Sequence, residues 1–459
     1  MKDARESRQF VIVGAGLAGS LMAIYLGRRG HRVEVLERRH DPRGTNTDSS
    51  GRSINLGLSE RGIRVLRDIG LLDTLLPRMV PMRGRAIHRP NGELVLQPYG
   101  TNDSQILHSI LRRDLNIALI DKAETSATVH FSFGTRLTGL AKDETVATCI
   151  DERDGRQREV KADAVIGADG VFSMVRGEMQ RGEPADYHQE FLDWGYKEVT
   201  IPPAPDGTAR TELQALHVWP GSQGLIVAHP NIDNSLTGSV FLPLLGEHSL
   251  VALDSPEAVH SFFDDAFPGA RGLMPDLVEE FKTNPVGTMV SIRTSPWHYK
   301  GQIVLIGDAC HAVYPFYGQG MNAAFEDCAQ LDSCLGRHPD DWASAFEEYQ
   351  RLRKPHTDVL ADLSKQNFVE LRDRLRSPLH LLMKRLDLLL NRMFPEAWKP
   401  LYTMVSHTTM PYAKALERAE RQEKIIKSIV AGVLVTTTAS ALSASHSFLK
   451  RGSHVDRLR

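Results

Sequence analysis

The feature that most constrains the fold is a glycine-rich turn between two apolar runs near the N-terminus. The stretch FVIVGAGLAGSLMAIYLGRRGHRVEVLE, residues 10–37, starts with an apolar run that leads into Gly14, Gly16 and Gly19. An apolar stripe at helical spacing follows, and a second apolar run ends in Glu37. The change of period from strand to helix and back to strand predicts a complete βαβ unit, and therefore an α/β fold.

The three glycines have the spacing of a dinucleotide-binding turn. Gly14 permits the tight turn, Gly16 lets a pyrophosphate approach the backbone, and Gly19 lets helix and strand pack closely. The N-terminus of the helix carries partial positive charge that favours phosphate. Glu37 is placed to bind a ribose 2′-hydroxyl and would repel a 2′-phosphate, so the turn predicts FAD or NAD rather than NADP; an ordinary βα turn is the alternative.

Two later apolar runs also end in acidic groups. Residues 164–167 lead to an Asp-Gly pair that begins at Asp169, and residues 303–306 lead to a Gly-Asp pair that ends at Asp308. Both runs are typical of buried parallel strands, whose carboxyl ends bind ligands in open α/β sheets. We therefore expect three strand ends to converge on one ligand.

The rest of the chain predicts a second sheet and a helical region. Alternating runs at 213–219, 224–228 and 236–242, separated by Pro and Gly, indicate an antiparallel sheet that roofs a substrate pocket. Helical patterns follow at 325–335, 342–351, 357–375 and 379–393. The expected organisation is a discontinuous Rossmann-like FAD-binding domain (8–189 and 296–335), an inserted antiparallel β-sheet substrate domain (190–295), a helical C-terminal region (336–427) and a weakly apolar tail (428–459).

Composition excludes several classes of partner and site. The net charge of −2 shows no excess that would draw the chain to nucleic acid or an anionic membrane. The four cysteines, Cys149, Cys310, Cys328 and Cys334, form no CxxC pair, so we expect small apolar residues in a reducing, cytoplasmic setting and no metal site. The polar N-terminus does not resemble a secretory signal.

The C-terminal tail is the one segment that suggests a membrane. Residues 428–449 contain no Lys, Arg, Asp or Glu, and they are long enough to cross a bilayer as a helix. Eight of the 22 residues are Ser or Thr, however, which makes the segment weakly apolar. A transmembrane helix, a helix lying on the membrane surface and a disordered tail all stay open.

The motifs together resemble a known family. The turn at Gly14, the Asp-Gly pair at Asp169 and the Gly-Asp pair at Asp308, in this order, resemble the single-component flavoprotein aromatic hydroxylases. Local strings narrow the resemblance to the kynurenine 3-monooxygenase family, among them GRSINLGLSERG, PMRGRAIH, ALHVWP, VYPFYGQGMNAAFEDC, NFVELR and LYTMVS. The similarity extends from about residue 10 to residue 427.

The resemblance implies the reaction. FAD would be the resident cofactor and NADPH a transient co-substrate, and O₂ would supply the oxygen that hydroxylates L-kynurenine to 3-hydroxy-L-kynurenine in tryptophan catabolism, through a flavin C4a-hydroperoxide. The flavin would carry the chemistry, with no protein nucleophile or base and no metal. A flavin hydroxylase of another aromatic acid, or an FAD-dependent reductase or dehydrogenase that does not use O₂, are the alternatives.

The resemblance also assigns cofactor residues. Asp308 can accept a hydrogen bond from a ribityl hydroxyl, and backbone N–H groups after Gly320 can stabilise negative charge on the reduced flavin. The expected FAD-binding residues are Gly14, Gly16, Ala18, Gly19, Leu36, Glu37, Arg38, Arg39, Gly57, Arg112, Leu137, Asp169, Asp308, Gly320, Met321 and Asn322.

For the substrate, the resemblance implies that Arg85 and Tyr99 hold the carboxylate, with Asn367 and Tyr402 completing the polar contacts. A guanidinium suits a carboxylate because its planar fork can donate two parallel hydrogen bonds. No proton-transfer role is expected for His311. The expected walls around the aromatic ring are Leu216, Leu225, Phe241, Pro315 and Phe316.

Overall fold

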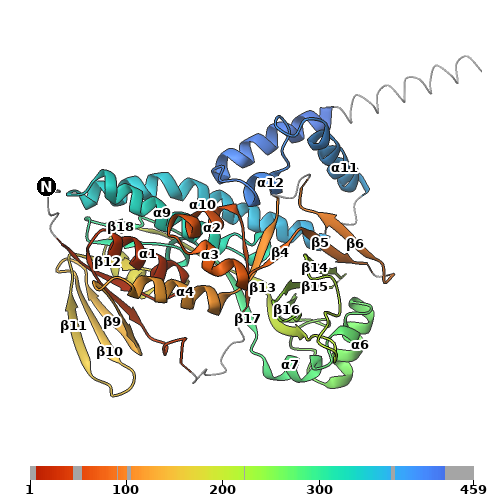
Figure 1. Ribbon diagram of the computed structural model, residues 1–459, viewed down its shortest axis with the longest axis horizontal. Coiled ribbons are helices and arrows are strands. Elements are labelled where there is room, and N and C mark those ends of the chain that lie inside the picture. Colours follow the sequence, from red (N-terminus) through yellow and green to blue (C-terminus); the bar gives the residue numbers. More distant parts are fainter. Residues whose placement is uncertain are drawn as a thin grey trace, which may run out of the picture.

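The computed structural model describes residues 7–44, 54–89, 91–100, 105–221, 223–373 and 378–428. Within these ranges the strands form four sheets, and helices pack around them (Figure 1).

The strands are β1 (Gln9–Val13), β2 (Arg32–Glu37), β3 (Asn55–Leu58), β4 (Val80–Met82), β5 (Gly84–His88), β6 (Leu94–Pro98), β7 (Leu107–Leu111), β8 (Val129–Phe133), β9 (Thr135–Ala141), β10 (Val146–Asp151), β11 (Gln157–Lys161), β12 (Ala164–Gly167), β13 (Asp186–Ile201), β14 (Ala215–Pro220), β15 (Leu225–Pro230), β16 (Leu236–Pro243), β17 (Gly287–Ser295), β18 (His298–Tyr299) and β19 (Ile303–Leu305). The helices are α1 (Leu17–Arg28), α2 (Glu60–Asp68), α3 (Leu72–Leu75), α4 (Arg112–Glu124), α5 (Met174–Gln180), α6 (Pro256–Ala266), α7 (Leu277–Thr283), α8 (Asp308–His311), α9 (Gly320–Arg337), α10 (Trp342–Asp373), α11 (Pro378–Met393) and α12 (Leu401–Ser406), with 3-10 turns η1 (Leu76–Arg78), η2 (Arg271–Leu273) and η3 (Pro315–Tyr317).

The first sheet is the predicted nucleotide-binding one, with strand order β18-β19-β12-β1-β2-β8. Its strands from β19 to β8 run parallel, and their carboxyl ends lie in register: Val13 is opposite Gly167, and Gly167 is opposite Leu305. All of β12 is buried, as is typical of parallel strands covered on both faces. The predicted βαβ unit and the convergence of three strand ends at one edge are therefore confirmed.

The second large sheet has the order β17-β13-β16-β15-β14-β5-β6. The three strand runs predicted between residues 213 and 242 are confirmed as β14, β15 and β16. The sheet is nevertheless wider than the predicted 190–295 segment, because β5 and β6 join it from the N-terminal part of the chain. β5 pairs in parallel with β14, which places Arg85 opposite Leu216. This long-range pairing is not encoded in the local pattern of either strand.

The two faces of this sheet have different neighbours, because side chains along a strand alternate between faces. One face, including Trp219 and Ile226, packs in a hydrophobic cluster with α6 and α7. The other face, including Leu225 and Phe241, packs with side chains from the η3 region and α10. Arg85 lies on this second face because its neighbour in register, Leu216, does.

The C-terminal region is helical, as predicted, but with one break fewer than expected. The patterns at 342–351 and 357–375 belong to a single helix, α10, which continues through Pro355. Buried contacts hold the helix on both sides of this proline, since Arg353 is paired with α9 and Leu360 packs in a separate core cluster. Tertiary packing thus outweighs the local cost of proline in a helix interior.

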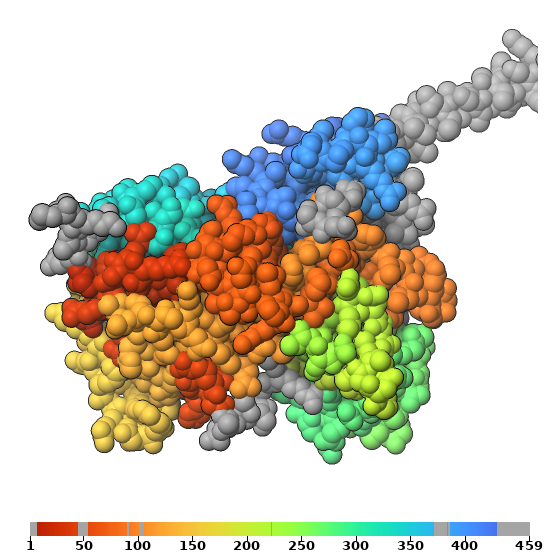
Figure 2. Space-filling view, in the orientation of Figure 1, coloured from red at the N-terminus to blue at the C-terminus, as the bar shows by residue number. Residues whose placement is uncertain are grey.

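The C-terminal helices lie beside the N-terminal segment that carries β4 to β6. In Figure 2 the blue residues near position 400 adjoin the orange residues that precede position 100. Within the described part of the chain, no helix has the length and apolarity that a membrane crossing requires. The predicted membrane-associated tail lies almost entirely outside the described residues, so its association stays a prediction.

Candidate functional site

The nucleotide turn contains two packed glycines and one open glycine. A Cβ atom on Gly14 would lie 2.5 Å from the carbonyl oxygen of Ala168, and one on Gly19 would lie 1.9 Å from the carbonyl oxygen of Gly14. Around Gly16, the N-cap residue of α1, no described atom lies within 4 Å of such a Cβ. Gly14 therefore lets the turn pack against the segment that follows β12, and Gly19 lets α1 pack against the turn. Gly16 leaves space at the positive end of α1, where a phosphate would fit.

Glu37 ends β2 directly beside this turn. Its carboxylate accepts hydrogen bonds from the backbone N–H groups of Ala15 (2.9 Å) and Arg39 (2.9 Å). The acidic side chain therefore lies at the edge of the turn, close to where a ribose would follow the phosphates.

Asn322 organises the side of the site where the flavin ring is expected. The residue is fully buried, and its Nδ2 donates to the carbonyl oxygens of Gly57 (3.0 Å) and Gly318 (3.1 Å). Its Oδ1 accepts from the backbone N–H of Ser59 (3.0 Å). These bonds fix β3 against the start of α9. The N-cap of α9 makes no side-chain hydrogen bond, so the backbone N–H groups from Gly320 onward form an uncapped positive end.

Asp308 occupies the position predicted for it, directly after β19 and at the start of α8. Gly307 before it has φ +61°, a left-handed conformation that favours glycine. Asp308 is exposed, and no described residue forms a hydrogen bond with its carboxylate. The Asp308 carboxylate is thus available as an acceptor. Gly57, another residue expected at the cofactor, also has open space beside it, because no described atom lies within 4 Å of a Cβ built on it.

Two of the residues expected at the cofactor have side chains that are used elsewhere or point into the protein, and a third, Arg112, is exposed. Asp169 caps α5: its carboxylate accepts from the Ser173 hydroxyl (2.5 Å) and from two backbone N–H groups. Leu137 is buried in the first core, and Arg112 is an exposed residue in the first turn of α4. Any FAD contact by Leu137 would therefore come from its backbone. The remaining expected residues are Ala18 in α1, Leu36 at the end of β2, the exposed pair Arg38 and Arg39, and the half-buried Met321.

The residues present fit FAD. The open space at Gly16 suits a pyrophosphate, the uncapped N-terminus of α9 suits the electron-rich edge of a flavin, and the exposed Asp308 at the start of α8 offers an acceptor. All three lie at or beside the edge where β1, β12 and β19 end.

Three of the four residues expected to bind the substrate's polar groups lie together. The Arg85 guanidinium carbon is 4.6 Å from the ring centroid of Tyr402 and 6.0 Å from that of Tyr99. The two tyrosine rings stack with centroids 5.5 Å apart and an interplanar angle of 25°. These side chains come from β5, from the residue after β6 and from α12, so the cluster joins distant parts of the chain.

The electrostatics of this cluster suit an anion. Tyr99 is 7% exposed, and its hydroxyl has no hydrogen-bond partner among the described residues. Burial and the neighbouring Tyr402 raise the pKa of Tyr99 well above its usual value despite the opposing effect of Arg85, so Tyr99 remains a donor. Burial works to lower the pKa of Arg85, but Tyr402 and Tyr99 raise it by more, so the guanidinium stays charged. The cluster therefore presents a cation and an unused O–H donor.

The fourth expected residue, Asn367, makes its side-chain hydrogen bond to a wall residue and not to a member of this cluster. It is in α10, and its Nδ2 donates to the carbonyl oxygen of Phe316 at 2.8 Å. The Phe316 ring in turn contacts the ring of Phe241 (centroids 5.3 Å apart) and stacks on that of Phe368 (4.6 Å). Asn367 thus fixes a wall residue.

Four of the five expected wall residues belong to one apolar face. Leu225 is opposite Phe241 in the sheet, and both pack in one cluster with Phe316 and Leu216. Leu216, like Tyr402, also packs against the cluster that contains Tyr99, so it links the apolar face to the polar cluster. Pro315 is exposed and is not part of the described cluster.

Two further residues contact the polar cluster but were not expected there. The ring of Tyr317 stacks on Tyr402 with centroids 5.9 Å apart, and the ring of His407 lies 5.6 Å from Tyr99 and 6.0 Å from Tyr402. The only sequence signal was proximity, since Tyr317 follows the expected Phe316 and His407 follows the LYTMVS string.

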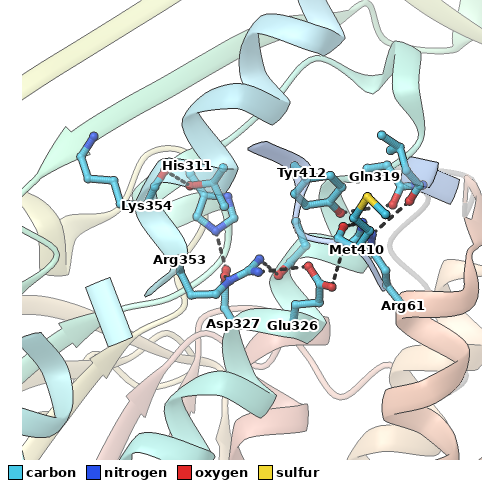
Figure 3. A network of polar contacts seen from close by, with 12 residues as sticks. Arg61, His311, Gln319, Glu326, Asp327, Arg353, Lys354, Met410 and Tyr412 are labelled. Carbon is cyan, nitrogen blue, oxygen red and sulfur yellow. Dashed lines mark hydrogen bonds and ion pairs between the residues drawn. The ribbon is translucent and has the colours of Figure 1, made fainter. Parts of the chain in front are cut away.

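A buried network of charges lies behind the site (Figure 3). Arg353 of α10 donates to Asp327 (2.7 Å) and Glu326 (3.0 Å), both on α9. Asp327 also accepts from His311 of α8, while Glu326 accepts from Arg61 of α2 (2.5 Å). Arg61, Arg353 and His311 therefore connect four helices through two carboxylates.

The network also reaches the C-terminal segment and the loop before α9. Arg61 donates to the carbonyl oxygens of Val405 (3.0 Å) and Met410, and its guanidinium lies 3.9 Å from the ring centroid of Tyr412. The Tyr412 hydroxyl donates to Gln319 Oε1 (3.3 Å). Figure 3 shows these groups converging from separate elements.

Asp327 is ionised within this network. Burial alone would raise its pKa, but His311 and Arg353 together hold the pKa below its usual value. Its charge therefore stabilises the fold above about pH 4, and this contribution is lost as the pH falls through the lowered pKa. Cys310, His311 and Asp327 have potential ligand atoms within 4.8 Å of one another, but the Asp327 oxygens already accept bonds from Arg353, His311 and a backbone N–H. The four cysteines are buried and free, as predicted.

Comparison with known proteins places the chain among flavoproteins. Residues 8–364 match the model of a family described as FAD binding domain. A curated kynurenine 3-monooxygenase from Salinispora arenicola is 52% identical, covering 96% of this chain and 97% of the relative. Another from Myxococcus xanthus is 42% identical, covering 94% and 93%.

Solved structures show the same fold. PqsL, a probable FAD-dependent monooxygenase from Pseudomonas aeruginosa, matches with a TM-score of 0.65 at 24% identity, covering 82% of this chain and 100% of that chain. A 2-methyl-3-hydroxypyridine-5-carboxylic acid oxygenase matches with a TM-score of 0.65 at 20% identity, covering 82% and 96%.

The glycine turn yields a matched pair of variants. Gly16→Ala should leave the apoprotein folded, because its Cβ meets no described atom, but should lower the bound FAD because the methyl group takes the phosphate's space. Gly19→Ala should lower the thermal midpoint of the apoprotein itself, because its Cβ collides with the Gly14 carbonyl. Absorbance gives the FAD-to-protein ratio and calorimetry gives the midpoint. Equal loss of apoprotein stability in both variants would contradict the assignment of Gly16 to the ligand.

Arg353 yields a test of the buried network. Arg353→Met should lower the free energy of unfolding by about 3–5 kcal/mol, because it leaves buried carboxylates without their cation. Arg351→Met is the matched control: Arg351 is exposed on the same helix and lies 3.7 Å from Glu348. Its removal should cost under about 1 kcal/mol. Urea denaturation of both variants measures the difference, and similar losses would show that the network does not stabilise the fold.

Proposed function

The chain belongs to the kynurenine 3-monooxygenase family of FAD-binding proteins, and on this premise we propose that it hydroxylates L-kynurenine to 3-hydroxy-L-kynurenine with NADPH and O₂. The observation that carries the proposal is the cluster of Arg85, Tyr99 and Tyr402 at one end of the apolar face of the second sheet. Such an arrangement suits a molecule that has a carboxylate at one end and an aromatic ring at the other.

FAD would lie along the edge where the strands of the first sheet end. The open space at Gly16 would take the pyrophosphate, Glu37 the adenosine ribose and Asp308 the ribityl chain. The backbone N–H groups from Gly320 onward would face the flavin ring. When bound, FAD accepts a hydride from NADPH and activates O₂, so that one oxygen atom is transferred to the aromatic ring and the other leaves as water.

The polar cluster would fix the substrate's carboxylate. Arg85 is half-buried and charged, and it can donate two parallel hydrogen bonds to a carboxylate. The Tyr99 hydroxyl is buried without a described partner, which costs free energy until a ligand accepts its hydrogen bond. A bound carboxylate satisfies both groups.

The apolar face would orient the ring and exclude water. Leu216 joins this face to the polar cluster, so a ligand held by its carboxylate would extend its ring toward Leu225, Phe241 and Phe316. Asn367 contributes by holding the Phe316 backbone. When the substrate's aromatic ring is held in place and water is excluded, transfer of an oxygen atom to the ring carbon is favoured over loss of that oxygen as hydrogen peroxide.

Another aromatic acid would use the same carboxylate site, so the choice of L-kynurenine rests on the family. Association of residues 428–449 with a membrane surface is proposed on their composition alone, since they are free of charged residues.

L-Kynurenine should accelerate NADPH oxidation by the purified FAD-loaded enzyme and yield 3-hydroxy-L-kynurenine. NADPH consumption is followed by absorbance and the product by mass spectrometry. An NADPH oxidation rate that L-kynurenine leaves unchanged, with no hydroxylated product, would contradict the proposed substrate and leave the FAD assignment intact.

Arg85→Met should raise the dissociation constant for L-kynurenine at least about 30-fold, because a hydrogen-bonded ion pair to the carboxylate is lost. Arg89→Met is the matched control, since Arg89 is an exposed residue just after β5 that pairs with Glu93 at 2.8 Å. Titration of the flavin absorbance with substrate measures both constants. Unchanged affinity in Arg85→Met would exclude Arg85 from carboxylate binding.

A further inference from the structure

Two buried polar atoms without hydrogen-bond partners lie in the same group of rings. They are the hydroxyl of Tyr99 and Nε2 of His407, and neither has a partner among the described residues. The two rings are 5.6 Å apart at their centroids, and both contact Tyr402. Buried polar atoms are rarely left unpaired, so a ligand is the natural partner of both.

His407 is held in place by the fold. It is the C-cap of α12, the helix that begins one residue before Tyr402. Its ring also forms a hydrogen bond with the backbone of Ile106. We assign this bond to Nδ1, which then donates to the Ile106 carbonyl oxygen, because Nε2 is buried and has no partner among the described residues. Nε2 is then left as a hydrogen-bond acceptor.

The charge state of His407 agrees with this tautomer. Burial lowers the pKa of His407 to about 4, although the bond to Ile106 opposes the shift. The imidazole is therefore neutral at physiological pH, and its free nitrogen carries a lone pair rather than a proton. Such a nitrogen would not bind a carboxylate, but it can accept a hydrogen bond from an ammonium group.

The cluster as a whole complements a zwitterion. Arg85 and the Tyr99 hydroxyl are donors for a carboxylate, whereas His407 Nε2 is an acceptor on the same group of rings. In an α-amino acid the carboxylate and the ammonium are both bonded to the same carbon, the α-carbon. A simple aromatic acid would satisfy the donors and leave the buried nitrogen of His407 unpaired, at a cost in free energy.

We propose that His407 is a specificity-determining residue that accepts a hydrogen bond from the α-ammonium group of the substrate. It thereby selects an aromatic amino acid over the corresponding acid without the amino group. The inference rests on the proposed function, because the ammonium is supplied by L-kynurenine.

The test compares two ligands on three forms of the FAD-loaded enzyme. The ligands are L-kynurenine and its analogue in which hydrogen replaces the α-amino group. The forms are the wild type, His407→Phe, which keeps a ring but removes the acceptor, and His407→Gln, whose amide oxygen can replace Nε2. Dissociation constants come from the flavin absorbance, KM and kcat from steady-state kinetics, and folding is checked by the FAD content and thermal midpoint.

His407→Phe should weaken L-kynurenine binding about 10- to 100-fold while affinity for the analogue does not fall, because only the bond to a charged group is lost. The loss should appear in KM more than in kcat, and His407→Gln should restore most of it. A change that is equal for the two ligands, or absent for both, would overturn the role of His407 and leave the proposed function standing. Failure of the wild type to bind either ligand would instead contradict the proposed function and the inference with it.

Discussion

The rest of the site depends on the buried pairing of Arg353 with Asp327 and Glu326. This pairing joins α10 to α9, and the same two carboxylates also hold His311 of α8 and Arg61 of α2. Buried charges are costly unless each has a well-placed partner, so these elements can adopt few other arrangements without leaving a charge unpaired. The loop after β19 and the start of α9 are fixed by this requirement.

The network also explains how distant segments reach one site. Arg61 binds the backbone on both sides of the turn that follows α12, at Val405 and Met410. α12 carries Tyr402, and the segment after it carries His407, so a residue of α2 positions both against Tyr99. α2 begins directly after Ser59, and the backbone N–H of Ser59 donates to the side chain of Asn322. The polar cluster and the flavin side of the site are thus tied to one rigid core.

Much of the fold could be predicted from the sequence, because its signals are local. Apolar runs predicted the strands that end before Gly14, before Asp169 and before Asp308, and the structure confirms all three strands. Glycines mark these strand ends because steric requirements there disfavour a larger side chain. The pairing of β5 with β14 and the passage of α10 through Pro355 were not predictable, because long-range packing decides both. Within the site, proximity of Arg85, Tyr99 and Tyr402 followed from the family resemblance. Asp169 as a helix cap and His407 beside Tyr99 depend on side-chain geometry that no local pattern carries.

The central claim is that one face of the second sheet holds the carboxylate of an aromatic amino acid at Arg85 and Tyr99 and its ring at Phe241 and Phe316. A crystal structure of the FAD-loaded enzyme with L-kynurenine tests it most directly. The account predicts a carboxylate within hydrogen-bond distance of Arg85 and the Tyr99 hydroxyl, with the aromatic ring against Phe316. A carboxylate bound elsewhere, or a ring turned away from Phe316 and the flavin, would contradict it.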